Sequence, residues 1–143
     1  MSYAVAQEIA SRLANITVAN GYKTNAGQNV ALGWRSIDRA EGLPSLTVTE
    51  TGYEPDTEPA RLPGRGRYRI QWAIEALVPV TGNALQTLYD IEADVIRALF
   101  DPNDSLGALT KKLTYSGRQF SREQAGSDIA RLVTTIVTWH NEN

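Results

Sequence analysis

The sequence predicts an α+β domain in which a mainly antiparallel sheet of about five strands packs against two helices, in the order α-β-β-β-α-β-β. Two segments repeat apolar residues at helical spacing, and five segments alternate their side chains as strands do. Helices and strands do not alternate one for one, as they do in a parallel sheet. The chain has 143 residues, enough for one substantial core, so we predict a single domain over residues 1–143.

The first half of the chain is predicted to hold one helix and three strands. Apolar residues recur from Val5 through Ile9 to Leu13, which predicts a helix over about 3–14. Asn20-Gly21 then marks a turn. Alternating side chains predict strands at about 30–34 and 46–49 and a longer strand at 68–78. The last of these is expected to be the spine of the sheet.

The second half is predicted to hold one helix followed by two strands. Pro79 ends the preceding strand, and Asn83 with Gln86 three residues later has the pattern of a capping box. An apolar stripe predicts a helix over about 84–100, and it consists of Leu88, Ile91, Val95, Ala98 and Leu99. Strands are predicted over roughly 109–120 and 128–139, the second of them rich in β-branched residues.

A long, charge-segregated loop is predicted at about 50–67, between the second and third strands. Connections longer than about 12 to 15 residues are uncommon in compact domains and are usually functional or disordered. Prolines and glycines interrupt the segment, and its acidic half, which begins at Glu50, precedes its basic half. We therefore predict that a partner outside the protomer orders it. The candidate contact residues are Glu54, Asp56, Glu58, Arg61, Arg65, Arg67 and Arg69.

The residue types argue against an enzyme. The chain has no cysteine and a single histidine, His140, which we predict to be a surface residue at a strand end. Asp90 and Asp94 share a helix face, but Arg97 follows them, so we interpret that face as solvated and ion-paired. Neither a glycine-rich phosphate cradle nor a nucleophile elbow is present. No catalytic, cofactor-binding or metal site is predicted.

Composition narrows the classes of protein further. The absence of cysteine fits a reducing compartment, and no apolar run approaches the roughly 18 residues that span a bilayer. The first residues have no secretory signal pattern. A formal net charge of −2 argues against a dedicated nucleic-acid binder, although a local basic patch can still act. We expect a soluble, intracellular protein without a membrane partner.

Two short phrases and the order of the elements carry a resemblance to a known family. The first phrase is Asn20-Gly21-Tyr22-Lys23-Thr24, after the leading helix, and the second is Asp90-Ile91-Glu92-Ala93-Asp94, in the second helix. With the three strands between them and the closing β-branched strand, the likeness covers nearly the whole chain. The chain resembles the tail terminator, or tail completion, proteins of long-tailed bacteriophages, the group that includes the minor tail protein U of lambda-like phages.

The resemblance implies a structural virion protein without enzymatic activity. Such a subunit would form a hexameric ring at the head-proximal end of the tail tube, stop tube polymerisation and provide the surface on which the head docks. Its implied partners are further copies of itself, the tail tube protein and the head-tail connector or neck proteins. The implied location is the neck region of the virion tail, and the host cytoplasm during assembly.

Alternatives remain open for the loop and for the whole chain. The arginines have three interpretations: contact with a neighbouring protein, non-specific contact with the phosphates of DNA in the lumen of a ring, or simple solvation. The chain is also compatible with another phage neck or head-completion protein. A small RNA-binding or regulatory α+β module is the alternative from a different class, because Tyr68 and Trp72 share a strand face beside the arginines. The same two residues alternate with polar ones as core residues do.

Overall fold

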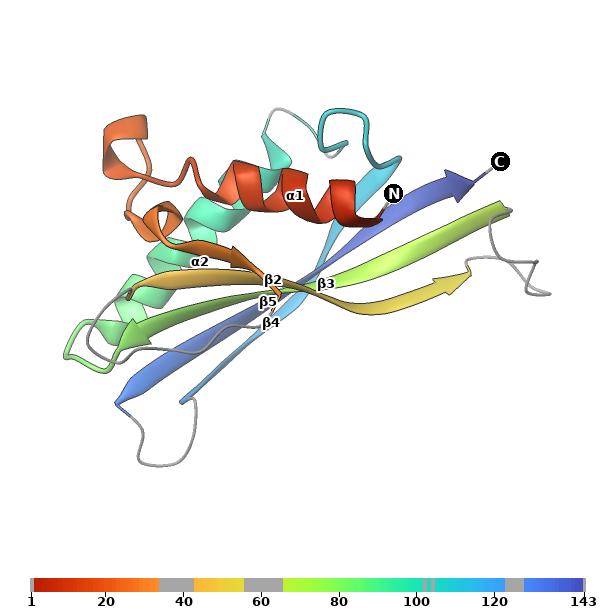
Figure 1. Ribbon diagram of the computed structural model, residues 1–143. Coiled ribbons are helices and arrows are strands. Elements are labelled where there is room, and N and C mark those ends of the chain that lie inside the picture. Colours follow the sequence, from red (N-terminus) through yellow and green to blue (C-terminus); the bar gives the residue numbers. More distant parts are fainter. Residues whose placement is uncertain are drawn as a thin grey trace.

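The computed structural model describes residues 2–33, 43–55, 66–101, 103, 105–122 and 128–142. Two helices, α1 (Ser2–Leu13) and α2 (Ala84–Phe100), lie on the same side of a five-stranded sheet (Figure 1). Two short 3-10 helices, η1 (Val18–Asn20) and η2 (Ala26–Gln28), connect α1 to the sheet. The strands are β1 (Val30–Leu32), β2 (Ser45–Pro55), β3 (Gly66–Pro79), β4 (Lys112–Arg122) and β5 (Ile129–Glu142). The predicted α+β class and element order are confirmed.

The sheet is mixed, with the strand order β1-β2-β3-β5-β4. The pairs β2–β3, β3–β5 and β5–β4 are antiparallel, as predicted, whereas β1 runs parallel to β2 with Val30 opposite Leu46. Parallel neighbours require a long connection instead of a tight turn, and the chain between Leu32 and Ser45 provides one. Only the short edge strand therefore departs from the antiparallel arrangement.

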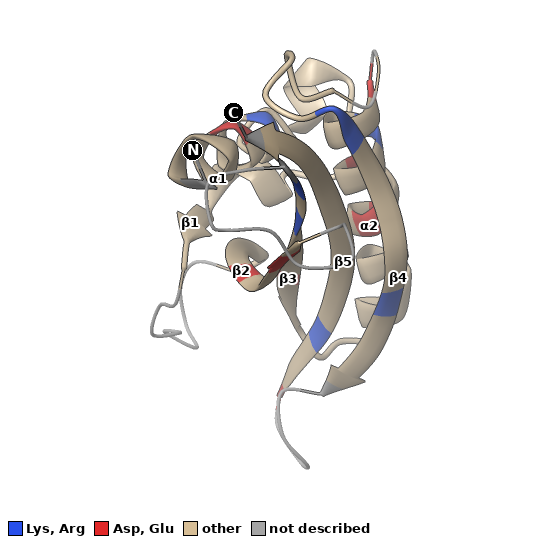
Figure 2. Cartoon of the chain, turned by 90° about the vertical axis from the view of Figure 1, so that its right-hand side faces the viewer, with Lys and Arg blue, Asp and Glu red and all other residues tan. Residues whose placement is uncertain are grey.

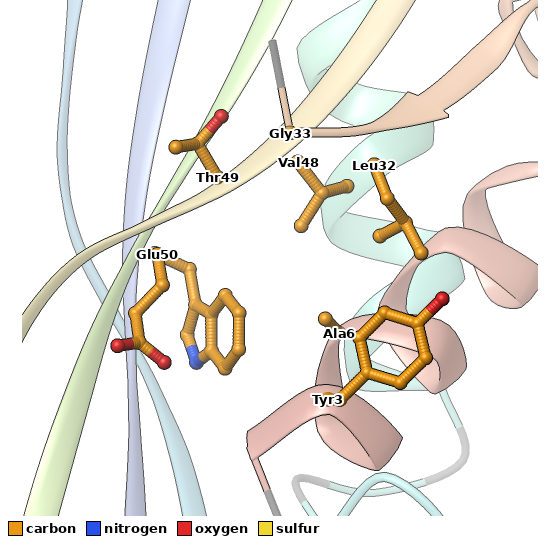
Figure 3. Close-up of a pocket in the computed structure, with 8 residues that line it drawn as sticks. Tyr3, Ala6, Leu32, Gly33, Val48, Thr49 and Glu50 are labelled. Atoms are coloured by element: carbon orange, nitrogen blue, oxygen red, sulfur yellow. The ribbon is translucent and has the colours of Figure 1, made fainter.

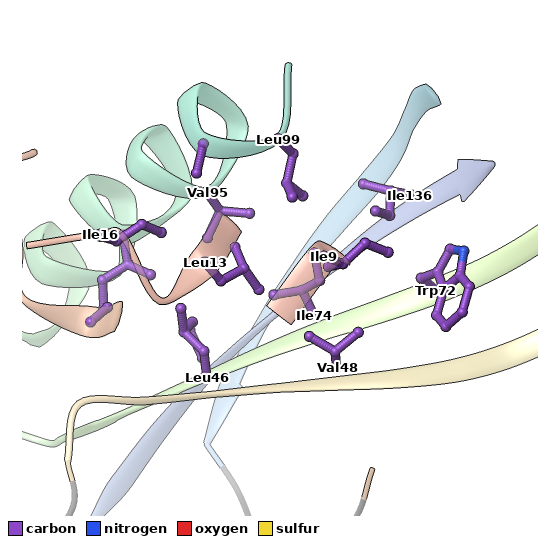
Figure 4. Close-up of a cluster of buried hydrophobic side chains, with 14 of the residues drawn as sticks. Ile9, Leu13, Ile16, Leu46, Val48, Trp72, Ile74, Val95, Leu99 and Ile136 are labelled. Atoms are coloured by element: carbon purple, nitrogen blue, oxygen red, sulfur yellow. The ribbon is translucent and has the colours of Figure 1, made fainter. Parts of the chain in front are cut away.

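The core lies between the helices and one face of the sheet (Figure 4). Alternate residues of the two longest strands point toward the helices, and Trp72 on β3 lies opposite Ile136 on β5. Helix α1 contributes Ile9 and Leu13, and helix α2 contributes Val95 among others. Each such buried side chain contributes roughly 1.5 to 3 kcal/mol relative to exposure. Burial of this one face holds the helices on the sheet.

A hydrogen-bonded polar group is buried within this core. The indole Nε1 of Trp72 donates to Thr138 Oγ1 at 2.9 Å, and Nε2 of His140 lies 2.8 Å from the same oxygen. His140 is only 3% exposed and stacks on Tyr68, with ring centroids 5.1 Å apart. The prediction of a surface histidine was wrong, because β5 continues to Glu142 and alternation turns His140 toward the helices.

The predicted loop is shorter than expected. Strand β2 continues to Pro55 and β3 begins at Gly66, so Glu50 and Glu54 and also Arg67 lie in strands. A bulge between Glu50 and Gly52 interrupts the register, and pairing then resumes as far as Pro55 opposite Tyr68. The Tyr53 and Tyr68 rings, with centroids 4.9 Å apart, pack across this extension. Residues 56–65, where the rest of the predicted loop falls, lie outside the described residues.

The predicted capping box at the start of α2 is absent. Asn83 occupies the N-cap position, but its side chain makes no capping hydrogen bond. The backbone instead closes the first turn, since Thr87 N donates to Asn83 O at 2.9 Å and Ala84 N donates to Thr81 O at 3.1 Å. The predicted bounds of the helix are nevertheless those observed.

We predict that Thr138→Val lowers the free energy of unfolding by about 1 to 3 kcal/mol, because it removes the acceptor of a buried indole N–H while keeping the side-chain shape. Thr135→Val is the matched control, because Thr135 is on the same strand but on the face away from the helices, half-buried. It should change stability by no more than about 0.5 kcal/mol. Urea unfolding measures both, and equal losses would contradict the assignment.

Candidate assembly surface

The second face of the sheet carries neither helix. On β5 its side chains are half-buried, and on β3 the same face holds Gln71, Ala73 and Glu75. On β5 the face consists of Arg131, Val133, Thr135, Val137 and Trp139. Figure 1 shows both helices on the opposite side. Most of this mixed polar and apolar face is therefore open, and we call it the open face, although Leu77 of β3 and Ser45 and Thr47 of β2 on the same side of the sheet are buried.

Two of the candidate contact residues pair with each other on this face. Glu54 lies opposite Arg69 in the β2–β3 register, and its Oε1 is 2.9 Å from Arg69 Nη2 and 3.0 Å from Nε. The Arg69 guanidinium also lies 5.7 Å from the centroid of the Trp139 ring. Both charged side chains are substantially exposed, at 57% for Glu54 and 41% for Arg69, so the pair contributes roughly 0 to 1 kcal/mol. Their charges are already matched within the protomer.

The remaining candidate contact residues are only partly placed. Arg67 is exposed at the start of β3, opposite Asn141 of β5 and at the same end of the sheet as the Glu54–Arg69 pair. The other four lie outside the described residues, and they are Asp56, Glu58, Arg61 and Arg65. The structure therefore brings together one acidic and one basic residue of the predicted set and places one further arginine near them.

A polar hollow of about 320 Å³ lies on the open face beside this pair. Gly52, Glu54 and Arg69 line one part of it, and Thr114 and Trp139 line another. The indole Nε1 of Trp139 donates to Thr114 Oγ1 at 3.4 Å, which fixes the orientation of the ring. The hollow makes this part of the open face concave, so that a side chain of a partner can fit into it.

A second hollow, of about 450 Å³, lies between the start of α1 and the β1–β2 edge (Figure 3). Tyr3 and Ala6 from the helix and Leu32 and Val48 from the strands line it. Among the described residues that line it, Glu50 is the only charged one. This lining suits an apolar side chain better than a polar ligand.

A buried carboxylate connects α2 to the segment after α1. Asp94 is 2% exposed, and its side chain accepts hydrogen bonds from Lys23 N at 3.0 Å, from Thr24 N at 2.9 Å and from Thr24 Oγ1 at 2.8 Å. The interpretation of this helix face as solvated was wrong for Asp94. A signal was present in the sequence, because helical spacing places Asp94 on the same face as the buried Ile91 and Ala98.

Arg97, one turn further along α2, holds the same segment. Its Nη1 donates to Gly21 O at 2.8 Å, and its guanidinium lies 4.5 Å from the centroid of the Tyr22 ring. Gly21 has a φ of 89°, a left-handed conformation that favours glycine. The two sequence phrases that carry the family resemblance therefore meet in space. Their role visible in the structure is to join α2 to the loop after α1.

Glu92, on the opposite flank of α2, joins the helix to the edge strand β4. Glu92 is 5% exposed, accepts a hydrogen bond from the Tyr115 hydroxyl at 3.0 Å and forms a salt bridge with Arg118. The guanidinium of Arg118 lies 5.1 Å from the ring centroid of Tyr89 and 5.3 Å from that of Phe120. Burial raises the pKa of Tyr115 above its ordinary value, and the hydrogen bond to Glu92 raises it further. The same carboxylate raises the pKa of Arg118.

The described residues contain no group of three or more His, Cys, Asp or Glu side chains that could hold a metal ion. Among the helices that the structure describes, neither has the length and apolar character needed to cross a membrane. The sequence matches no protein-family model, and comparison with curated proteins finds no match. What the chain does is therefore inferred from its own residues, fold and surfaces.

We predict that Asp94→Ala lowers the free energy of unfolding by about 2 to 3 kcal/mol, because three donors lose a charged acceptor. Asp90→Ala is the matched control on the same helix, since Asp90 is half-exposed, and it should cost no more than about 0.5 kcal/mol. Urea unfolding followed by circular dichroism compares the two. Equal effects would show that Asp94 does not hold the segment after α1.

Tyr115→Phe should lower the free energy of unfolding by about 1 kcal/mol at pH 7, because the hydrogen bond to Glu92 is lost. The folded-state pKa of Tyr115 is raised, so its contribution is fully present below the ordinary pKa of 10.0 and is lost as pH rises through the folded-state value. Urea unfolding of both proteins at pH 7 and above pH 10 tests this. A difference that does not shrink at the higher pH would contradict it.

Proposed function

We propose that this chain is a tail terminator of a long-tailed bacteriophage. It would form a hexameric ring at the head-proximal end of the tail tube, stop tube polymerisation and present the head-docking surface. The proposal rests on the resemblance carried by the Asn20–Thr24 and Asp90–Asp94 phrases, and the structural observation that supports it is the asymmetry of the sheet, which has one covered face, one open face and two unlike edges. This asymmetry supports a subunit that completes its surface by contact with other copies of itself.

A ring needs a heterologous interface, in which one patch of a protomer meets a different patch of its neighbour. The described sheet offers such a pair of patches. Its β4 edge is 11 residues long, whereas its β1 edge has only 3 residues. A long edge strand presents backbone groups that a neighbouring chain can pair with. The two edges are unlike patches, as a head-to-tail contact requires, whereas pairing of β4 with β4 of a second copy would give a two-fold dimer.

The charged residues at the facing ends of β2 and β3 supply the second element of the proposal. Because Glu54 and Arg69 pair with each other, contact with a partner would fall to Arg67 and to the candidates in 56–65. Carboxylates of a neighbouring subunit or of the tube end would be their partners. In the second interpretation, the same arginines would contact DNA phosphates in the lumen. The proposed hexameric ring is the same in both interpretations.

The other proposed partners follow from the position of the ring. They are the tail tube protein on one side and the head-tail connector or neck proteins on the other. The protein would lie in the neck region of the virion tail, and in the host cytoplasm during assembly. The role is structural, without an enzymatic step.

The structure weighs against the RNA-binding alternative. That alternative needs aromatic rings exposed on a sheet face, where bases can stack. Tyr68 and Trp72 are 4% and 2% exposed, and both point toward the helices. They belong to the core and are not accessible to bases.

We predict that the purified chain shortens tubes when it is added in small amounts to polymerising tube protein of the parent phage. Arg67→Glu should require about tenfold more protein for the same shortening, which corresponds to about 1.4 kcal/mol of lost contact energy. Lys23→Glu is the charge-matched control, since Lys23 is exposed on the segment held by α2. Electron microscopy gives the tube lengths.

Two results would contradict the proposal in different ways. Tubes of unchanged length with the unmodified chain would overturn the terminator function and leave another neck or head-completion protein as the better description. Shortening by the unmodified chain and by Arg67→Glu at equal concentrations would keep the terminator function and remove Arg67 from the contact.

A further inference from the structure

A hollow of about 280 Å³ lies at the end of the sheet where the C-terminus lies, and it is strongly basic. Arg67 from the start of β3 lines one part of it, while Lys111 and Lys112 at the start of β4 line another. Trp139 and Asn141 of β5, the strand between them, are also part of the lining. Figure 2 shows basic positions at this end, on β4 and close to the C-terminus.

The cations of this hollow differ from most of the other lysines and arginines whose side chains the structure describes. Arg12, Arg69, Arg118 and Arg131 each form a salt bridge with a glutamate. In the part of the chain that the structure describes, no salt bridge neutralises Arg67, Lys111 or Lys112, and no carboxylate is among the residues lining the hollow. All three are exposed. Like charges gathered without counter-charge create a local positive potential that attracts an anion.

We propose that this hollow binds phosphate groups of a nucleic-acid backbone through Lys111 and Lys112 and, in the second interpretation of its partner given above, through Arg67. Arg67 and the two lysines lie on either side of β5, so their backbones are about 10 Å apart, from two strand spacings of about 4.8 Å. Their side chains line the same hollow. A DNA strand carries a charge about every 3.4 Å along the helix axis, so it presents several phosphates over that span.

The composition of the lining favours nucleic acid over an acidic protein segment. Trp139, whose side chain is half-buried on the open face, is part of the same lining as the cations, and a groove that combines basic and aromatic side chains is typical of nucleic-acid binding. The hollow is too small for a base pair, so the contacts are with the backbone and carry no sequence information.

Binding by one chain is weak, because three phosphate contacts act against a formal net charge of −2. In the proposed ring, six copies of the hollow would act together on one DNA molecule and strengthen the binding. That strengthening rests on the proposed function. Binding by the purified chain does not, so the two proposals can fail separately.

Fluorescence anisotropy with a labelled 20-base-pair DNA of arbitrary sequence tests the inference at about 50 mM salt. Lys112→Gln should weaken binding about tenfold and reduce the slope of affinity against salt by about 0.9, the value for one phosphate contact. Lys23→Gln removes the same charge from a distant exposed position and should change neither quantity. Absence of binding by the unmodified chain, or equal weakening by both variants, would overturn the inference.

Competition at constant ionic strength separates the sources of the anion. Polyglutamate that displaces the DNA as well as unlabelled DNA does would overturn the nucleic-acid assignment in favour of an acidic protein partner. Inorganic phosphate should displace the DNA only weakly, because a single phosphate replaces one of several contacts that the DNA makes together, and strong displacement would reduce the hollow to a site for free phosphate. A chain that shortens tubes without binding DNA would overturn this inference and leave the proposed function intact.

Discussion

The alternation of side chains along β3 and β5, the two 14-residue strands, is the constraint on which the rest of the structure depends. It sends every second side chain of both strands under the helices and leaves the others on the second face, which is open except around the buried Leu77. The Trp72–Thr138 hydrogen bond lies within the covered half, so a polar contact there also depends on the register. A shift of one residue would exchange the two faces. The register of the β3–β5 pair therefore determines which side chains form the core and which form the open face.

Much of this fold could be predicted from the sequence, because local periodicity determines it. The bounds of α2 and the covered face of β3 follow from the spacing of apolar residues alone. The parallel direction of β1 does not, because it depends on how the chain returns to the sheet between Leu32 and Ser45. The burial of His140 also depends on a distant segment, since Tyr68 on β3 covers its ring. Local sequence patterns do not show which distant segments of the chain will pair or pack together.

Charged residues were harder to predict than apolar ones, and for a physical reason. A carboxylate is buried only where donors from other segments meet it, as Lys23 and Thr24 meet Asp94. Its own sequence neighbourhood does not show those donors. Glu54 and Arg69 were likewise predicted to contact a partner outside the protomer. The β2–β3 register instead places them opposite each other, and they form a salt bridge within one chain. Among the described residues of that predicted surface, Arg67 is the one that is exposed and does not belong to the Glu54–Arg69 pair.

The central claim is that this chain stops the growth of a phage tail tube. Electron microscopy of lysates from the parent phage or prophage, with this gene deleted, tests the claim most directly. Loss of a terminator should give headless tails of uncontrolled length beside filled heads without tails, because only loss of the stop signal lets a tube continue to grow. Normal particles, or heads in the absence of any tails, would contradict it.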